Sequence, residues 1–141
     1  MFFLRDLPTR DMVAATTRAL PGLDPDAILA RLEELRRASL RLRRIEAFLA
    51  GHGLSQTQFL VIMVIVREPD RTELTPGEIA ARLDVSRPVL SKALATMERG
   101  GLIARGVDKD DARRAGIAPT ETGRARFDAL LPAYFEALMA E

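Results

Sequence analysis

Apolar residues recur every three to four positions in several stretches of the chain, a pattern that predicts a mainly helical protein. Residues 59–66 form an unbroken apolar run, which predicts a helix buried at the centre of the domain. A further apolar stripe after Gly123 predicts a C-terminal helix that Pro132 kinks or splits. The longest stretch covers residues 25–50, where apolar residues repeat every seven positions: Ile28, Leu35, Leu42 and Leu49. We expect this long helix to pack against its own domain and a partner subunit.

Polar residues in front of these stretches predict where the helices begin. Thr75 precedes Pro76 and lies three residues before Glu78, which is the spacing of a capping box. Ser86 is a fresh N-cap for the next helix. Three other predicted helices have a candidate cap in the same place: Thr9, Asp24 and Ser55. Two short helices that begin at Thr75 and Ser86 and are joined by a tight turn indicate a helix-turn-helix.

The helix after Ser86 has two unlike faces. Its core face is predicted from the i, i+3, i+4, i+7 spacing of Leu90, Ala93, Leu94 and Met97. The opposite face carries Pro88, Ser91 and Lys92, with Arg87 at the N-terminal tip, and has no carboxylate. A slim, cationic helix that can hydrogen-bond base edges suits the major groove of DNA, which is about 12 Å wide.

Two short strands around a charged loop are predicted after that helix. Residues 102–105 and 115–118 can pair as a hairpin, and Gly100-Gly101 ends the preceding helix. A charged hairpin directly after a helix-turn-helix is a wing. It can lay Arg113 or Arg114 into the neighbouring minor groove, where narrow A·T-rich tracts attract arginine. The predicted fold class is therefore mainly α with a small β-hairpin wing (α+β).

Residues 54–127 resemble the winged helix of the MarR family, the multiple-antibiotic-resistance type of bacterial transcription regulators. The most specific mark is a wing written D-x-R, five residues, L-T, two residues, G. It stands here as Asp111-Ala112-Arg113, Pro119-Thr120 and Gly123, with Pro119 where leucine is usual. The resemblance implies a dimeric DNA-binding repressor or activator with long N- and C-terminal dimerisation helices. It also implies a small, aromatic or lipophilic effector that changes the affinity for DNA.

The resemblance and the residue pattern together give one expected mechanism. A homodimer places two recognition helices about 34–36 Å apart on a pseudo-palindromic site in double-stranded DNA. Thr75 offers amides and a hydroxyl to a phosphate, and Asp111 orients Arg113. The expected division is 1–53 for the arm and dimerisation helices, 54–123 for the DNA-binding domain and 124–141 for a C-terminal dimerisation helix. The expected DNA-binding residues are Thr75, Ser86, Arg87, Pro88, Ser91, Lys92, Asp111, Arg113 and Arg114.

Composition narrows the alternatives. The 141 residues suit a single core, and the net charge of +1 is no argument for nucleic acid. The excess of cations is local, with eight cations against five carboxylates over residues 82–114. The chain has no cysteine and one histidine, His52, so disulfides, thiolate metal sites and His-rich metal sites are excluded and no cofactor is expected. The apolar run at residues 1–4 is too short for a signal peptide or a membrane span, and a cytoplasmic location is expected.

Other functions have weaker support. A serine nucleophile needs a base, and His52 is more simply a helix-end cap. The acidic loop at 108–111 lacks EF-hand spacing, so we do not expect an enzyme. The stronger competitor is a winged helix used for dimerisation or protein interaction without DNA. The arginines at 36–44 suggest nucleic acid, although a solvated face balanced by glutamates explains them more simply. No role is predicted for residues 1–23.

Overall fold

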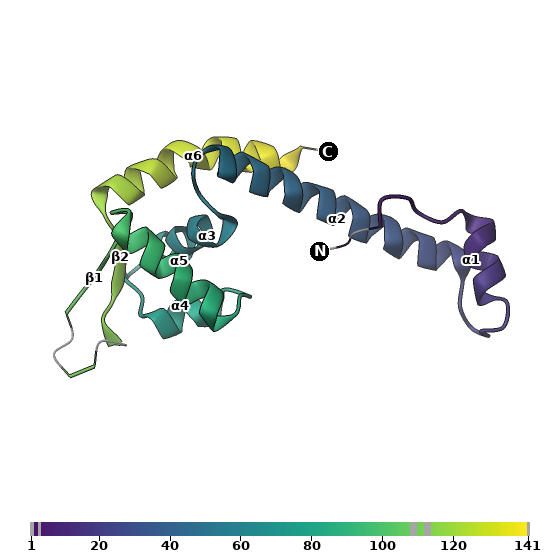
Figure 1. Cartoon of the computed structure of the whole chain (residues 1–141), viewed down its shortest axis with the longest axis horizontal. Coiled ribbons are helices and arrows are strands. Elements are labelled where there is room, and N and C mark those ends of the chain that lie inside the picture. The colour runs from purple at the N-terminus through teal and green to yellow at the C-terminus, as the bar shows by residue number, and fades with distance from the viewer. Residues whose placement is uncertain (1, 3, 108–109, 112–113, 141) are drawn as a thin grey trace.

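The computed structural model describes residues 2, 4–107, 110–111 and 114–140 of the chain. In chain order the elements are α1 (Arg10–Thr17), α2 (Pro25–Gly51), α3 (Gln56–Val66), α4 (Pro76–Arg82), α5 (Arg87–Arg99), β1 (Ile103–Arg105), β2 (Ile117–Pro119) and α6 (Glu121–Met139). Figure 1 shows a lobe built from α3 to β2 with α6 along its top, and α2 projecting from it. The predicted mainly α fold with a hairpin wing is confirmed.

Each predicted N-cap residue lies directly before a helix. The side chains of Thr9, Asp24, Ser55, Thr75 and Ser86 each accept a hydrogen bond from the first turn of the helix that follows. At α4 the capping box is complete, because Thr75 Oγ1 accepts from the Glu78 amide at 3.2 Å and the Glu78 carboxylate accepts from the Thr75 amide at 3.3 Å. At the far end of α5, Gly101 has φ of 72°, the left-handed glycine expected there.

The core of the lobe surrounds α3. Five of the eight residues in the apolar run at 59–66 are buried, in line with the prediction, and Phe59 is completely covered. The Phe59 ring lies 4.9 Å from that of Phe127 and 4.4 Å from that of Tyr134, both on α6. Burial raises the pKa of Tyr134. These ring contacts fix α6 against the lobe.

The wing is an antiparallel pair in which Ile103 lies opposite Pro119 and Arg105 opposite Ile117. Leu74 adds a bridge to Ile117, so the segment before α4 is tied to the base of the wing. The second strand begins two residues later and ends one residue later than predicted. Pro119 is its last residue, a position where the missing amide interrupts no ladder beyond it.

The start of α6 corrects the sequence prediction. The helix begins at Glu121, not after Gly123, because Thr120 is its N-cap and accepts from the Gly123 amide at 3.0 Å. A Cβ on Gly123 would overlap the backbone carbonyl of Leu102, so the glycine allows α6 to lie close to β1. The predicted split at Pro132 is also wrong, since the helix runs through that residue. Pro132 and Asp128, four residues earlier, are both exposed, so water can solvate the carbonyl that loses its amide partner.

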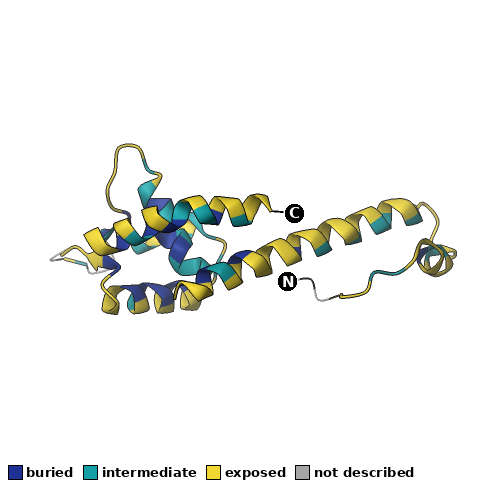
Figure 2. Ribbon diagram, turned by 90° about the horizontal axis from the view of Figure 1, so that it is seen from above, coloured by how far each residue is buried: buried dark blue, intermediate teal, exposed yellow. Residues whose placement is uncertain are grey.

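The N-terminal two-thirds of α2 stand outside the lobe, with α1 packed at the far end (Figures 1 and 2). Ile45 and Leu49 of the heptad stripe are buried in the lobe, whereas Leu35 and Leu42 are exposed by 51% and 42%. The end of α6 lies beside α2, where Arg44 Nη1 donates to the Ala140 carbonyl at 2.8 Å. Within the described residues no single helix is long and apolar enough to cross a membrane; only α2 and α3 taken together, bent by 89°, pass on length and composition.

Candidate DNA-binding surface

Helix α5 is placed as a recognition helix. The predicted core residues Leu90, Ala93, Leu94 and Met97 are all buried, which fixes the rotation of the helix about its axis. The opposite side presents Arg87, Pro88, Ser91 and Lys92 to solvent, as the spacing predicted. These four side chains occupy the first two turns of α5, where a helix entering the major groove contacts base edges.

Val89 belongs to the same surface, although the sequence analysis did not include it. Its side chain is 48% exposed beside Pro88 and Arg87, which is unusual for valine in a helix with a well-formed core face. A branched apolar side chain at this place can contact the methyl group of thymine in the major groove. The available signal was the helical phase, because Val89 lies outside the spacing of the core face.

The two caps on this surface are already engaged in the local fold. Ser86 is exposed, and its Oγ accepts from the Val89 amide at 3.4 Å. Thr75 is half-buried, and its Oγ1 accepts from the Glu78 amide. Each hydroxyl retains a proton to donate to an acceptor such as a phosphate oxygen. Both residues stay candidate DNA contacts, with hydroxyls oriented by the helix starts.

The structure sorts the cations near α5 into paired and free ones. Arg82 Nε donates to Glu68 at 2.8 Å, and its Nη1 donates to the Glu78 carbonyl at 2.9 Å, so this arginine holds the lobe together. Arg105 lies 3.6 Å from Glu98. Among the described residues of 82–114, the exposed cations that form no ion pair with another described residue are Arg87, Lys92, Arg99 and Arg114. The local positive charge is therefore concentrated on α5 and the wing.

The tip of the wing is only partly described. Arg114 is exposed, and its amide donates to the Asp111 carbonyl at 3.0 Å. Asp111 is half-buried at the turn. Arg113 lies outside the described residues, and so does the predicted contact between its guanidinium and Asp111. The role of Arg113 therefore stays a prediction from the motif.

A carboxylate at the base of the wing was not predicted. The carboxylate of Glu73 lies where a Cβ on Gly116 would be. Gly116, one residue before β2, therefore makes room for this side chain. Glu73 is exposed and precedes Leu74, which bridges to Ile117. Nothing local in the sequence indicates the contact of Glu73 with Gly116, because it depends on how the loop before α4 meets the hairpin.

The described residues also bear on a metal site and on a role of His52. Among them, no group of three or more histidine, aspartate or glutamate side chains is placed to hold a metal ion. His52 is the C-cap of α2, as expected, and its Nδ1 lies 2.9 Å from the Phe48 carbonyl. The buried polar side chain of Ser39 donates to the Phe2 carbonyl at 3.0 Å.

Comparison with known proteins agrees with this geometry. The family model described as MarR family matches residues 52–114. The chain is 31% identical over 96 residues to the HTH-type transcriptional repressor YetL of Bacillus subtilis (strain 168), and the alignment covers 68% of this chain and 57% of the repressor. The chain thus spans a little more than half the length of that relative.

Two solved structures show the same fold. AbsC, a MarR family transcriptional regulator from Streptomyces coelicolor, is similar with a TM-score of 0.73 and 19% identity, over 82% of this chain and 78% of AbsC. A mutant of MepR from S. aureus bound to an oligodeoxyribonucleotide is similar with a TM-score of 0.59 and 25% identity, over 74% of this chain and 76% of that protein. The family model and the likeness to YetL show that residues 52–114 form a MarR-family winged helix, and the two solved structures share its fold.

Proposed function

We propose that the protein is a sequence-specific DNA-binding regulator of transcription, a ligand-responsive repressor that binds a pseudo-palindromic operator as a homodimer in the cytoplasm. The observation that carries this proposal is the outer face of α5, where Arg87, Ser91 and Lys92 are exposed and no carboxylate intervenes. The relatives support it, because YetL is named a transcriptional repressor and the MepR structure contains an oligodeoxyribonucleotide. A small aromatic or lipophilic effector completes the proposal.

The proposed contacts follow from the placement of the side chains. Arg87 and Ser91 contact base edges, because a guanidinium and a hydroxyl can donate to purine and pyrimidine acceptors in the major groove. Lys92 meets a phosphate as a point charge. Thr75 and Ser86 donate to phosphates that flank the groove. Arg113 and Arg114 extend the contact from the wing into the minor groove.

The competing function, a protein-interaction module without DNA, fits this surface less well. Protein interfaces are centred on buried aromatic or large apolar anchors. Among the described residues of α5, the only large hydrophobic side chain that is strongly exposed is Val89. It is flanked by cations and a hydroxyl, which is the composition that a nucleic acid requires.

Substitution of Lys92 tests the DNA contact. We expect Lys92→Ala to weaken binding to an operator duplex and to reduce the slope of log K against log salt by about 2, since each copy in the dimer loses one phosphate contact that contributes about 0.9. The matched control is Arg18→Ala, which removes an exposed cation at the end of α1, far from α5. An unchanged salt slope in Lys92→Ala, or an equal loss in Arg18→Ala, would contradict the assignment.

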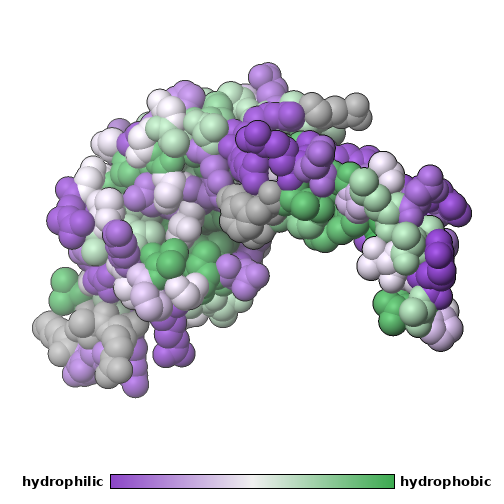
Figure 3. All heavy atoms as spheres, turned by 45° about the vertical axis from the view of Figure 1, so that its right-hand side comes forward, coloured by the Kyte–Doolittle hydropathy of each residue, from purple (hydrophilic) through white to green (hydrophobic). Residues whose placement is uncertain are grey.

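The dimer is proposed from the exposed apolar face of α2. Leu35, Ala38 and Leu42 continue the stripe that Ile45 and Leu49 begin inside the lobe, yet all three are exposed. Figure 3 shows apolar surface along the arm between the lobe and α1. Exposed apolar surface that continues a buried core is typical of a subunit interface. A second copy of the chain is the occupant that we propose for this face.

The charges of α2 favour an antiparallel arrangement of the two copies. Residues 24–34 contain four carboxylates and one arginine, whereas residues 36–44 contain five arginines and no carboxylate. A parallel pair would place like charges together. An antiparallel pair that crosses near Ala38 instead places residues 33–34 of one helix, both glutamates, opposite residues 42–43 of the other, next to Arg41 and Arg44. We therefore propose that α2 pairs with α2 of the second copy about a two-fold axis near Ala38.

Engineered cysteines can locate this axis, because the chain contains no cysteine of its own. We expect Ala38→Cys to give a disulfide-linked dimer under mild oxidation, since a residue on the axis meets its own copy within disulfide reach. Ala47→Cys is the matched control. It is also an exposed alanine of α2, but nine residues, or 2.5 turns, place it on the opposite face. Equal cross-linking at both positions, or none at Ala38→Cys, would refute the arrangement.

A further inference from the structure

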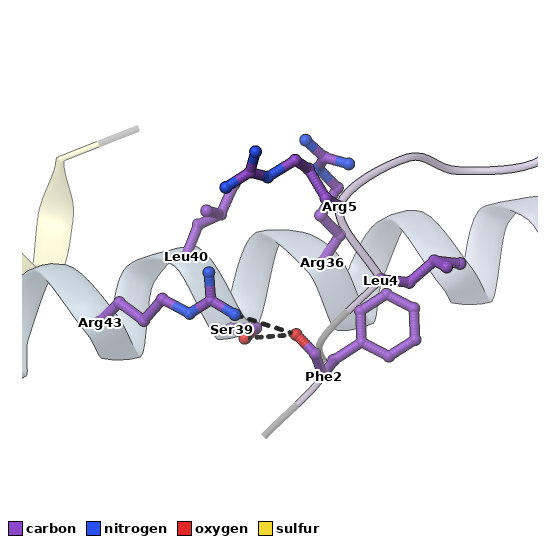
Figure 4. Close-up of a pocket in the computed structure, with 7 residues that line it drawn as sticks. All are labelled: Phe2, Leu4, Arg5, Arg36, Ser39, Leu40 and Arg43. Carbon is purple, nitrogen blue, oxygen red and sulfur yellow. Dashed lines mark hydrogen bonds between the residues drawn. The ribbon is translucent and has the colours of Figure 1, made fainter.

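Phe2, Leu4 and Arg5 lie alongside α2 and form a cleft with it (Figure 4). The Phe2 carbonyl accepts hydrogen bonds from Ser39 Oγ at 3.0 Å and from Arg43 Nη2 at 3.4 Å. The cleft between the N-terminal segment and α2 has a volume of about 450 Å³. Small-ligand sites in proteins begin at roughly 300 Å³, so the cleft is large enough for a small molecule.

Three arginines meet at this cleft without a carboxylate. Arg5, Arg36 and Arg43 all line it, and none of them forms an ion pair within the described part of the chain. Neighbouring arginines of α2 do have such partners: Arg31 pairs with Glu34 and Arg37 with Glu33. Like charges that are gathered together repel one another. A bound anion would relieve this repulsion.

The geometry selects the kind of anion. Figure 4 shows the side chains of Arg5 and Arg36 ending on the same side of α2, while Arg43 reaches toward Phe2. Arg43 is thus engaged in holding the N-terminal segment, and Arg5 and Arg36 are available for a ligand. A guanidinium presents a planar fork that matches a carboxylate. The other walls of the cleft consist of the apolar residues Phe2, Leu4 and Leu40 and of Ser39, whose hydroxyl donates to the Phe2 carbonyl.

We propose that this cleft binds a small organic carboxylate, whose charged end lies between Arg5 and Arg36 and whose apolar end lies against Leu4 and Leu40. The site is on the face of α2 opposite to Ala38, so the proposed second copy would not cover it. The bound molecule would tie the N-terminal segment to α2. Any effect of this ligand on DNA affinity rests on the proposed function, whereas binding itself does not.

The test uses hexanoate and its neutral amide, hexanamide, as probes in calorimetric titrations of the full chain without DNA. We expect hexanoate to bind with one site per chain, and hexanamide to bind at least tenfold more weakly because it cannot form the charged pair. Arg36→Gln should weaken hexanoate binding at least tenfold. Arg37→Gln is the matched control, since Arg37 is the next residue along, pairs with Glu33 and does not line this cleft.

The outcomes separate this site from the DNA-binding proposal. Circular dichroism of both variants shows whether they fold like the parent. Equal affinity for hexanoate and hexanamide would overturn the site. An equal loss of hexanoate affinity in Arg36→Gln and Arg37→Gln would also overturn it, because the binding would then depend only on the general positive charge of α2. Because no DNA is present, a protein that fails to bind any operator can still pass this test. Selective hexanoate binding that depends on Arg36 supports the site in either case.

Discussion

The winged-helix lobe and the projecting arm of α2 both carry apolar stripes, but the lobe buries its apolar residues within one copy and the arm leaves several of its own exposed. In the lobe, Phe59, Ile79 and Ile117 are fully covered by residues of the same chain. In the arm, Leu35 and Leu42 are about half exposed, although they continue the same stripe as the buried Leu49. The core of the lobe is therefore covered within one copy, whereas the apolar face of the arm is the surface for which we propose a second copy. On this proposal, the lobe contacts DNA and the arm sets the distance between the two recognition helices of a dimer.

Disruption of the arm should give the largest effect. Leu42→Glu places a charge on the proposed interface and removes a leucine from each copy, which costs roughly 3–6 kcal/mol of association at 1.5–3 kcal/mol per buried leucine. We expect sedimentation analysis to show a monomer at concentrations where the parent is a dimer, with an unchanged helical content. Leu40→Glu is the control, since Leu40 is similarly exposed (46%) but lies on another face of α2. A Leu42→Glu protein that remains dimeric would show that this face of α2 is not the dimer interface.

A substitution in the lobe should act on folding instead of association. Phe59→Ala deletes a fully buried ring that contacts Phe127 and Tyr134, and such changes cost about 3–5 kcal/mol of unfolding free energy. Urea unfolding followed by circular dichroism measures the loss. The matched change in the arm is Leu35→Ala, which should leave the stability of the lobe unaltered. If Leu35→Ala destabilises a monomeric sample as much as Phe59→Ala does, the arm is part of the core, and the proposed difference between lobe and arm is wrong.

The smallest expected effect concerns the start of α4. The hydrogen bond from Arg71 Nη2 to the Glu78 carboxylate, at 2.7 Å, lowers the pKa of Glu78. A carboxyl whose pKa is lower in the folded state stabilises the fold above its unfolded pKa, and this contribution is lost as the pH falls through the folded pKa. We expect Arg71→Gln to be slightly less stable than the parent at neutral pH, with a difference that shrinks in acid. A difference that grows as the pH falls would contradict this sign.

The sequence predicted the lobe better than the arm for a physical reason. Caps and helical faces are local, so Thr75, Ser86 and the core side of α5 could be assigned from spacing alone. Ion pairs and close approaches join distant segments. The pairing of Arg82 with Glu68 and the contact of Gly123 with Leu102 therefore appeared only in the structure. The heptad of α2 predicted a second packing partner, but not which of its residues remain exposed.

The exposure of residues on the outer face of α5 was predicted about as well as the helices of the lobe. Arg87, Pro88, Ser91 and Lys92 are exposed as expected, because the burial of Leu90 and Leu94 fixes the phase of the helix. Val89 was missed, since exposure of an apolar residue cannot be inferred from its type. The cation count over residues 82–114 overstated the free charge, because Arg82 and Arg105 lie beside carboxylates.

We propose above all that the outer face of α5 binds a particular DNA sequence. The most direct test titrates the purified protein into duplexes from its own upstream region at two salt concentrations, with a scrambled duplex of equal length alongside. We expect tight, salt-sensitive binding to one palindromic segment, with two chains per duplex and far weaker binding to the scrambled duplex. Equal affinity for every upstream segment and the scrambled duplex would contradict it.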